Sequence, residues 1–112
     1  MATGGGGRYG ALVIVLHLAG RVPIGGRPAL ESFLAEAKPF YERPGGIRVR
    51  LQWDRAEPTR FVEIMEYADE ATYLADQERV AGDPEMGAWL RRWHALLDGP
   101  IEVSVWDDAP VG

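Results

Sequence analysis

Apolar and polar residues alternate along several stretches of the chain with the period of a β-strand. Residues 47–53 (IRVRLQW) carry apolar side chains at every second position, and residues 60–67 (RFVEIMEY) read as a further strand. A side-chain period of two is typical of a strand with one covered face. Residues 11–18 (ALVIVLHL) are apolar on both faces, which predicts a strand in the middle of a sheet. Residues 101–106 (IEVSVW) predict a last strand.

Between the first two predicted strands, residues 28–43 show the spacing of an amphipathic helix. Pro28 stands at the first turn, where its missing N–H costs nothing. Pro39 falls inside the same segment and is expected to kink the helix or to end it early.

Two further helices are predicted from their capping residues. Asp69 is placed to cap a helix over 70–81 that ends at Gly82. Asp83 followed by Pro84 starts another helix. The apolar stripe of this last helix comprises Met86, Trp89, Leu90, Trp93, Leu96 and Leu97.

The two alternating strands can pair as a hairpin around a turn at 54–59. Placing Leu51 opposite Val62 brings Arg50 opposite Glu63, and such a cross-strand charge pair is favourable. In this register, Glu63 lies on the polar face of the sheet.

The predicted order is strand, helix, strand, strand, two helices, strand. It indicates an α+β ferredoxin-like domain, a split β-α-β arrangement whose four-stranded antiparallel sheet carries its helices on one face. The first and third strands are expected at the centre, and the other sheet face is left bare. A single domain is expected over 9–108, after a disordered, Gly-rich segment at 1–8.

Composition narrows the possible functions. The chain of 112 residues has a formal charge of −5 and no cluster of basic residues, which argues against nucleic acid as a partner. It contains no cysteine, which excludes disulfides and thiolate chemistry. The longest apolar run, 11–19, is about half the length that spans a bilayer, so no membrane association is expected. With no secretory signal pattern at the N-terminus, we expect a cytoplasmic protein.

Three segments carry a resemblance to a known superfamily: RFVEIMEYADEATYLADQ (60–77), DPEMGAWLRRW (83–93) and the last strand. The chain resembles the dimeric α/β-barrel proteins of ferredoxin-like fold, and its pattern is most similar to the antibiotic biosynthesis monooxygenases. The resemblance implies a homodimer that packs two bare sheet faces together. It also implies a small-molecule cavity inside each subunit, between sheet and helices.

The haem-degrading branch of the superfamily has an Asn on its first strand, a Trp closing its third strand and a His on its later helix. Here Tyr67 takes the place of the Trp and Trp89 that of the His, while His17 lies near the Asn position. Without that histidine, haem degradation is disfavoured. We therefore expect no cofactor.

The aromatic stripe of the last helix has two interpretations. Trp89 and Trp93 are i,i+4 neighbours that can pack against the sheet as core. They can also line a ligand pocket, since such pockets are largely apolar and aromatic. The expected substrate-binding residues are Trp53, Tyr67, Met86, Trp89 and Trp93.

His17 is the expected catalytic base, because an imidazole can be tuned to titrate near neutral pH. The competing interpretation is a buried neutral histidine with a local hydrogen-bond partner. His94 is expected at the border with solvent, and two histidines without H-x-x-x-H spacing predict no metal site.

Charged residues near the sheet, namely Arg48, Arg50, Glu63 and Glu102, are interpreted as surface or interface ion pairs. The alternative is that Arg50 or Glu63 binds substrate.

Two classes of function remain open. One is an enzyme similar to the cofactor-independent monooxygenases, acting on a flat, electron-rich aromatic that reacts with oxygen once deprotonated. The other is a non-catalytic dimer that binds a metabolite or serves as an interaction module. A cavity in the helix–sheet layer with His17 pointing into it would favour the enzyme.

Overall fold

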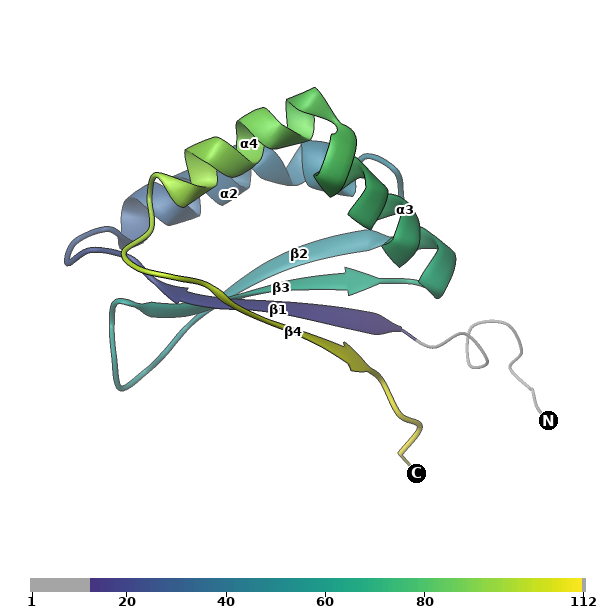
Figure 1. The fold of residues 1–112 in the computed structure, drawn as a ribbon. Helices are drawn as coiled ribbons and strands as arrows, with labels where there is room; N and C mark the ends of the chain where they lie inside the picture. The colour runs from purple at the N-terminus through teal and green to yellow at the C-terminus, as the bar shows by residue number, and fades with distance from the viewer. Residues whose placement is uncertain (1–12, 112) are drawn as a thin grey trace.

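The computed structural model describes residues 13–111 and shows four strands and three helices within them (Figure 1). The elements are β1 (Ile14–Arg21), α2 (Arg27–Glu42), β2 (Ile47–Trp53), β3 (Arg60–Tyr67), α3 (Glu70–Gly82), α4 (Pro84–His94) and β4 (Glu102–Asp107). The segment 1–8, predicted to be disordered, lies outside the described residues. β1 begins and ends three residues later than the predicted strand at 11–18.

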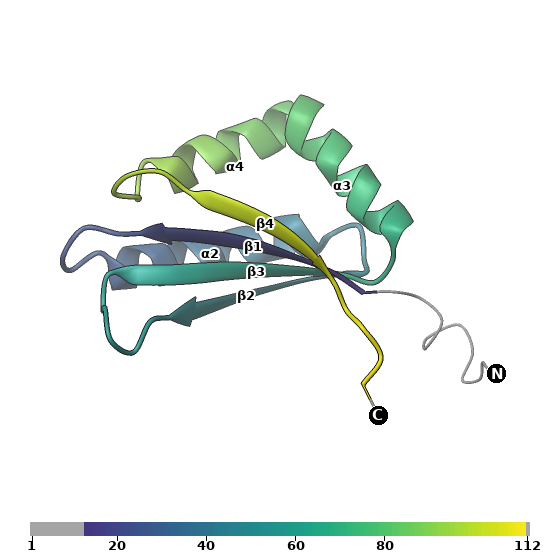
Figure 2. The ribbon, with the colours of Figure 1, turned by 60° about the horizontal axis from the view of Figure 1, so that its bottom comes forward.

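The strands form one antiparallel sheet in the order β2-β3-β1-β4. Figures 1 and 2 show the three helices on one side of this sheet, so the described residues leave the opposite face without a helix. The fold class, the antiparallel sheet and the central position of β1 and β3 confirm the expectation from the sequence.

The starts of α3 and α4 follow the predicted capping. The Asp69 side chain accepts a hydrogen bond from the Thr72 N–H at 2.8 Å, and Asp83 accepts one from the Glu85 N–H at 2.9 Å. Each carboxylate satisfies an N–H that the first turn leaves free.

The expectation of an early end to α2 is wrong, because the helix continues past Pro39 to Glu42. Pro39 and Ala35 are both exposed. Water can therefore reach the Ala35 carbonyl, which lacks its usual N–H partner.

The hairpin of β2 and β3 differs from the prediction by one residue in register. Leu51 pairs with Glu63, and Arg50 pairs with Ile64. Because side chains alternate between faces, this shift moves every residue of β3 to the other face of the sheet. Glu63 consequently points toward the helices, on the face that was predicted to hold Val62 and Ile64.

The turn and the larger side chains explain the observed register. The Asp54 N–H donates to the Arg60 carbonyl at 2.9 Å, and the two side chains form an ion pair at 3.0 Å. These contacts close the hairpin at Asp54 and Arg60. The same register buries Phe61, Met65 and Tyr67, which remove more apolar area from water than Val62 and Ile64 would.

The core fills the space between the sheet and the helices. Its largest fully buried side chains are Tyr67, Phe61, Leu30, Met86, Val22 and Asp76. None of the helices in residues 13–111 is both long and apolar enough to cross a membrane.

Candidate functional site

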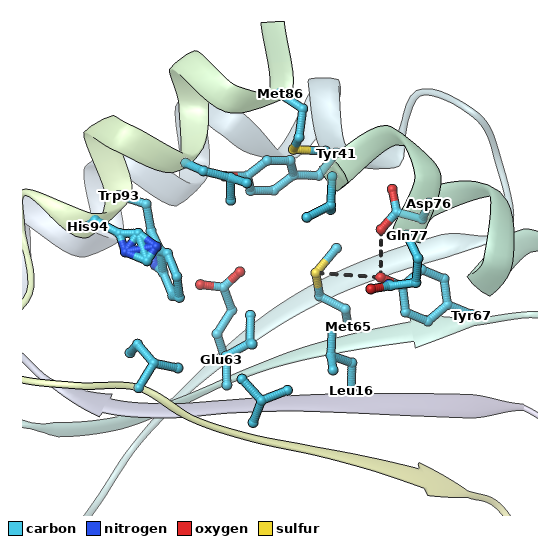
Figure 3. Close-up of a pocket in the computed structure, with 15 residues that line it drawn as sticks. Leu16, Tyr41, Glu63, Met65, Tyr67, Asp76, Gln77, Met86, Trp93 and His94 are labelled. Atoms are coloured by element: carbon cyan, nitrogen blue, oxygen red, sulfur yellow. Dashed lines mark hydrogen bonds between the residues drawn. The ribbon is translucent and has the colours of Figure 1, made fainter. Parts of the chain in front are cut away.

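A cavity of about 300 Å³ lies between the helices and the sheet (Figure 3). Most of its wall is apolar, formed by Leu16, Leu18, Met65, Val80, Met86, Leu90, Ile101 and Val103. The side chains that bring polar atoms to it are Tyr41, Glu63, Tyr67, Asp76, Gln77, Trp93 and His94. An apolar cavity with a few polar groups is the usual form of a small-molecule site.

Glu63 is the one acidic side chain that the sheet contributes to this cavity. It rises from β3 toward the helices (Figure 3), and only 3% of the residue is exposed. Its Oε1 atom has no hydrogen-bond partner among the described residues. Burial raises the pKa of Glu63 to about 7, and the indole of Trp93 opposes this shift only in part. The carboxyl group can therefore exchange a proton near neutral pH.

Trp93 faces the cavity from α4 and is buried, with its Nε1 atom unpartnered. Met86 lies two turns earlier on the same side of the helix, so the periodicity of α4 directs both side chains inward. The indole N–H and the Glu63 carboxyl point into the same space, near enough for the indole to lower the pKa of Glu63, while Trp93 Nε1 and Glu63 Oε1 have no partner at hydrogen-bond geometry. A donor and an acid–base group are thus both available to a ligand.

Another part of the cavity wall is formed by polar side chains that are hydrogen-bonded to one another. The Tyr67 hydroxyl donates to Oδ2 of Asp76 at 2.6 Å, and Arg79 donates to Oδ1 at 3.1 and 3.0 Å. Arg79 also donates to the carbonyls of Phe40 and Tyr41 at 3.0 and 2.8 Å. The network joins α3 to the sheet and to the end of α2. Burial, then the hydrogen bond to Asp76, raises the pKa of Tyr67, which keeps its proton.

Three of the five predicted substrate-binding residues meet at this cavity, namely Tyr67, Met86 and Trp93. Trp89 does not, because it points between α4 and α2. There its ring stacks on Phe40 at 6.0 Å, meets Phe33 edge-on at 5.9 Å, and is covered by Arg92 at 4.8 Å. Trp89 thus packs against the core, while Trp93 lines the cavity.

Trp53 also lies away from the cavity, at the end of β2. Its indole N–H donates to Glu31 of α2 at 3.0 Å, and Arg27 lies 4.7 Å from its ring. These contacts hold the edge strand β2 to α2.

His17 lies on the opposite face of the sheet from the cavity. Its neighbours Leu16 and Leu18 line the cavity, so the alternation of β1 turns His17 outward. It pairs with Ile64 and Ser104 in the sheet. The expectation that His17 supplies the base in the helix–sheet cavity is therefore corrected. Glu63 is the titratable side chain of the sheet that faces this cavity.

The charge pair predicted between Arg50 and Glu63 is absent, because the observed register places the two side chains on opposite faces of the sheet. Arg50 instead pairs with Glu66 at 2.8 Å on the bare face. The interpretation of Glu63 as a surface charge is wrong. A signal for its true position is present in the sequence, since Glu63 alternates with Phe61, Met65 and Tyr67, the largest apolar side chains of its strand.

His94 lines the mouth of the cavity and is exposed, as expected. Within residues 13–111, no three side chains of His, Asp or Glu gather as a set that could hold a metal ion.

The chain matches no protein-family model and no curated protein sequence. Its structure does resemble solved structures. A predicted antibiotic biosynthesis monooxygenase from Bordetella bronchiseptica has a TM-score of 0.72 at 18% identity, covering 88% of this chain and 99% of that chain. SnoaB, a cofactor-independent oxygenase from Streptomyces nogalater, has a TM-score of 0.69 at 21% identity, covering 90% and 97%. Protein SO0527 from Shewanella oneidensis has a TM-score of 0.66 at 23% identity, covering 87% and 91%.

The chain therefore has a ferredoxin-like α+β fold, and the solved structures that share this fold include antibiotic biosynthesis monooxygenase-like proteins. This confirms the resemblance seen in its sequence pattern. At these identities the similarity establishes the fold, and the activity has to be argued from the site.

Proposed function

We propose that this chain binds a small aromatic molecule in the helix–sheet cavity and acts as a cofactor-independent oxygenase with Glu63 as its base. The observation that carries the proposal is the Glu63 carboxyl, which is buried, has an unpartnered oxygen and faces an apolar cavity. The description of SnoaB as a cofactor-independent oxygenase supports the same chemistry in this fold.

The first step is proton transfer to Glu63. The ionised carboxylate takes a proton from an acidic C–H group of the substrate, whose electron pair spreads over the ring system as an enolate. A base with a pKa of about 7 is matched to this task at neutral pH. The Trp93 N–H is available to donate to the oxygen on which negative charge develops.

The enolate carbon then reacts with dioxygen. It donates electrons to form a C–O bond, and the resulting peroxide anion takes the proton back from Glu63. Loss of water breaks the O–O bond and leaves a carbonyl, so that one CH₂ group and O₂ become C=O and H₂O. The substrate supplies every electron that reduces the oxygen.

A second candidate is a non-catalytic metabolite-binding protein of the same fold. The hydrogen bonds at the cavity wall favour it. Tyr67 donates to Asp76 and Arg79 donates to Asp76, so these side chains already have partners and are not free to react with a ligand. Of the two buried carboxyl groups at this cavity, Glu63 is then the one left to take part in a reaction. A single free carboxyl suits recognition of a hydroxyl group as well as catalysis.

We also propose that two copies pack their bare sheet faces together as a homodimer. This face carries Trp106, which is 57% exposed and whose ring lies 6.0 Å from that of His17, near its edge. Burying such a surface against a twin removes apolar area from water. Equilibrium sedimentation tests the proposal, and a monomer at micromolar concentration would overturn it.

Titration of the purified protein with anthrones and polycyclic quinols tests the activity, with tryptophan fluorescence and oxygen uptake recorded together. Saturable quenching with oxygen consumption is expected for an oxygenase. Quenching without oxygen consumption would support the binding protein instead. An unchanged fluorescence across the panel would overturn both candidates.

A further inference from the structure

The described residues contain three buried side-chain polar atoms without a hydrogen-bond partner: Glu63 Oε1, Trp93 Nε1 and Gln77 Nε2. All three residues line the same cavity. Buried polar atoms are nearly always paired, because an unpaired one has lost its hydration without compensation. Their gathering at one cavity marks the positions where a ligand completes the hydrogen bonds.

The proposed reaction involves two of these atoms and leaves Gln77 unexplained. Glu63 takes a proton and Trp93 donates to the adjacent oxygen. The Gln77 amide takes part in neither step, although an amide nitrogen is a donor that needs an acceptor.

Gln77 also lies at a different end of the cavity. Figure 3 shows it on α3 beside Tyr67 and Asp76, whereas Trp93 lies on α4 at the other end, and Glu63 rises from the sheet between them. Asp76 accepts hydrogen bonds from Tyr67 and Arg79 and none from Gln77, whose Nε2 atom has no partner among the described residues.

We infer that the ligand carries a second, neutral oxygen acceptor at the end away from its acidic group, and that Gln77 is the specificity-determining residue that binds it. This inference rests on the proposed function, since it takes Glu63 as the partner of the acidic end. The ligand class is then an elongated aromatic with an ionisable oxygen or carbon acid at one end and a carbonyl at the other.

A site built to hydrogen-bond a ligand oxygen discriminates against an analogue that lacks it, because the protein donor is left buried and unpaired. The structure therefore predicts stronger discrimination at the Gln77 end than an apolar wall would give. Val80, one turn further along α3, also lines the cavity and has no polar atom in its side chain to make this distinction.

Two probes of nearly equal shape test the inference. 6-Acetyl-2-naphthol offers a carbonyl at the end opposite its hydroxyl, and 6-isopropyl-2-naphthol replaces that carbonyl with a methyl-bearing carbon. Dissociation constants are measured by fluorescence for the wild type and for Gln77→Met. For each protein, the dissociation constant of the isopropyl probe is divided by that of the acetyl probe. We expect this ratio to be about tenfold larger for the wild type than for Gln77→Met. Comparing the ratios cancels the difference in acidity between the two naphthols.

Two controls separate this inference from the proposed function. Glu63→Gln is expected to weaken both probes alike and to keep the preference for the acetyl group. Gln77→Asn, which retains a shorter amide, is expected to restore part of the preference. In the absence of ligand, Gln77→Met should melt at the same temperature as the wild type or higher, because it removes an unpaired buried donor.

The outcomes are distinguishable. If Glu63→Gln weakens both probes but Gln77→Met leaves the ratio unchanged, the proposed function survives and the inference about Gln77 is overturned, with water as the partner of the amide. If neither probe binds the wild type, the proposed function fails and the inference fails with it.

Discussion

Polar side chains on the two faces of the sheet differ in their exposure to water and in their hydrogen-bond partners. On the bare face, Arg50 and Glu66 pair at 2.8 Å with the arginine side chain 43% exposed, so each charge has both a partner and water. On the covered face, Glu63 is 3% exposed and one of its oxygens has no partner. Burial without a full set of partners raises the pKa of Glu63 on the covered face.

The difference shows that chemical type alone does not identify a functional residue. Histidine is the side chain that chemical type alone suggests as a base, whereas a carboxyl takes this role near neutral pH only after burial. The fold places the histidine outside the cavity and the carboxyl inside it. His17 of β1 and Glu63 of the neighbouring strand β3 thus exchange their expected roles, because their side chains lie on opposite faces of the sheet.

The largest effect is expected when the base is removed from the covered face. Glu63→Gln keeps the shape of the side chain but cannot accept the proton, so oxygen uptake with an active substrate should fall by about a hundredfold or more. His17→Gln, on the other face, should leave turnover unchanged. Steady-state oxygen consumption measures both, and a loss in His17→Gln equal to that in Glu63→Gln would return the base to His17.

The next largest effect is expected from a comparison of the buried ion pair on α3 with the exposed ion pair on the bare face of the sheet. Asp76→Ala removes the buried carboxylate that partners the largely buried Arg79 guanidinium and should lower the free energy of unfolding by about 3 kcal/mol. Glu66→Gln breaks the exposed pair with Arg50 and should cost at most about 1 kcal/mol. Urea unfolding compares the two, and equal losses would contradict the contrast in burial.

Stability should also depend on pH through Glu63. Its pKa is raised from 4.5 to about 7 in the folded state, so the folded protein binds more protons than the unfolded chain between these values. The free energy of unfolding therefore falls as pH rises through this window, by about 3 kcal/mol from this group. Urea unfolding from pH 4.5 to 8 should show this fall relative to Glu63→Gln. Parallel curves for the two proteins would mean that the pKa is not raised.

A smaller effect separates the two tryptophans of α4. Trp93→Phe removes the N–H that faces the cavity and should weaken binding of an anthrone by about fivefold. Trp89→Phe changes a ring packed between helices and should leave binding unaltered. Fluorescence titration should also lose most of its quenching in Trp93→Phe. Equal losses of affinity in the two variants would indicate a general effect of packing.

The smallest effect on folding is expected from Arg50→Glu. The variant places two acids together on the exposed face and should lower the free energy of unfolding by less than about 1 kcal/mol. If the bare faces form the dimer, the same charge reversal should weaken dimerisation more strongly. Sedimentation that shows an unaltered dimer would remove Arg50 from the interface.

The amino-acid sequence by itself predicted the fold. Hydrophobic periods of two and near four, the caps Asp69 and Asp83, and the two-sided apolar run of β1 are local features, and they were enough to order the sheet. Of the five residues that the sequence predicted to bind substrate, Tyr67, Met86 and Trp93 line the cavity, and Trp53 and Trp89 do not.

The tertiary structure decided which face of the sheet each polar residue joins. Both registers of the β2–β3 hairpin satisfy the alternation, and they differ by one residue in the closure at Asp54 and Arg60. Packing against the helices, which buries Phe61, Met65 and Tyr67 together, and the contacts that close the turn select one of them. Because a shift of one residue exchanges the two faces, that choice moved Glu63 into the cavity.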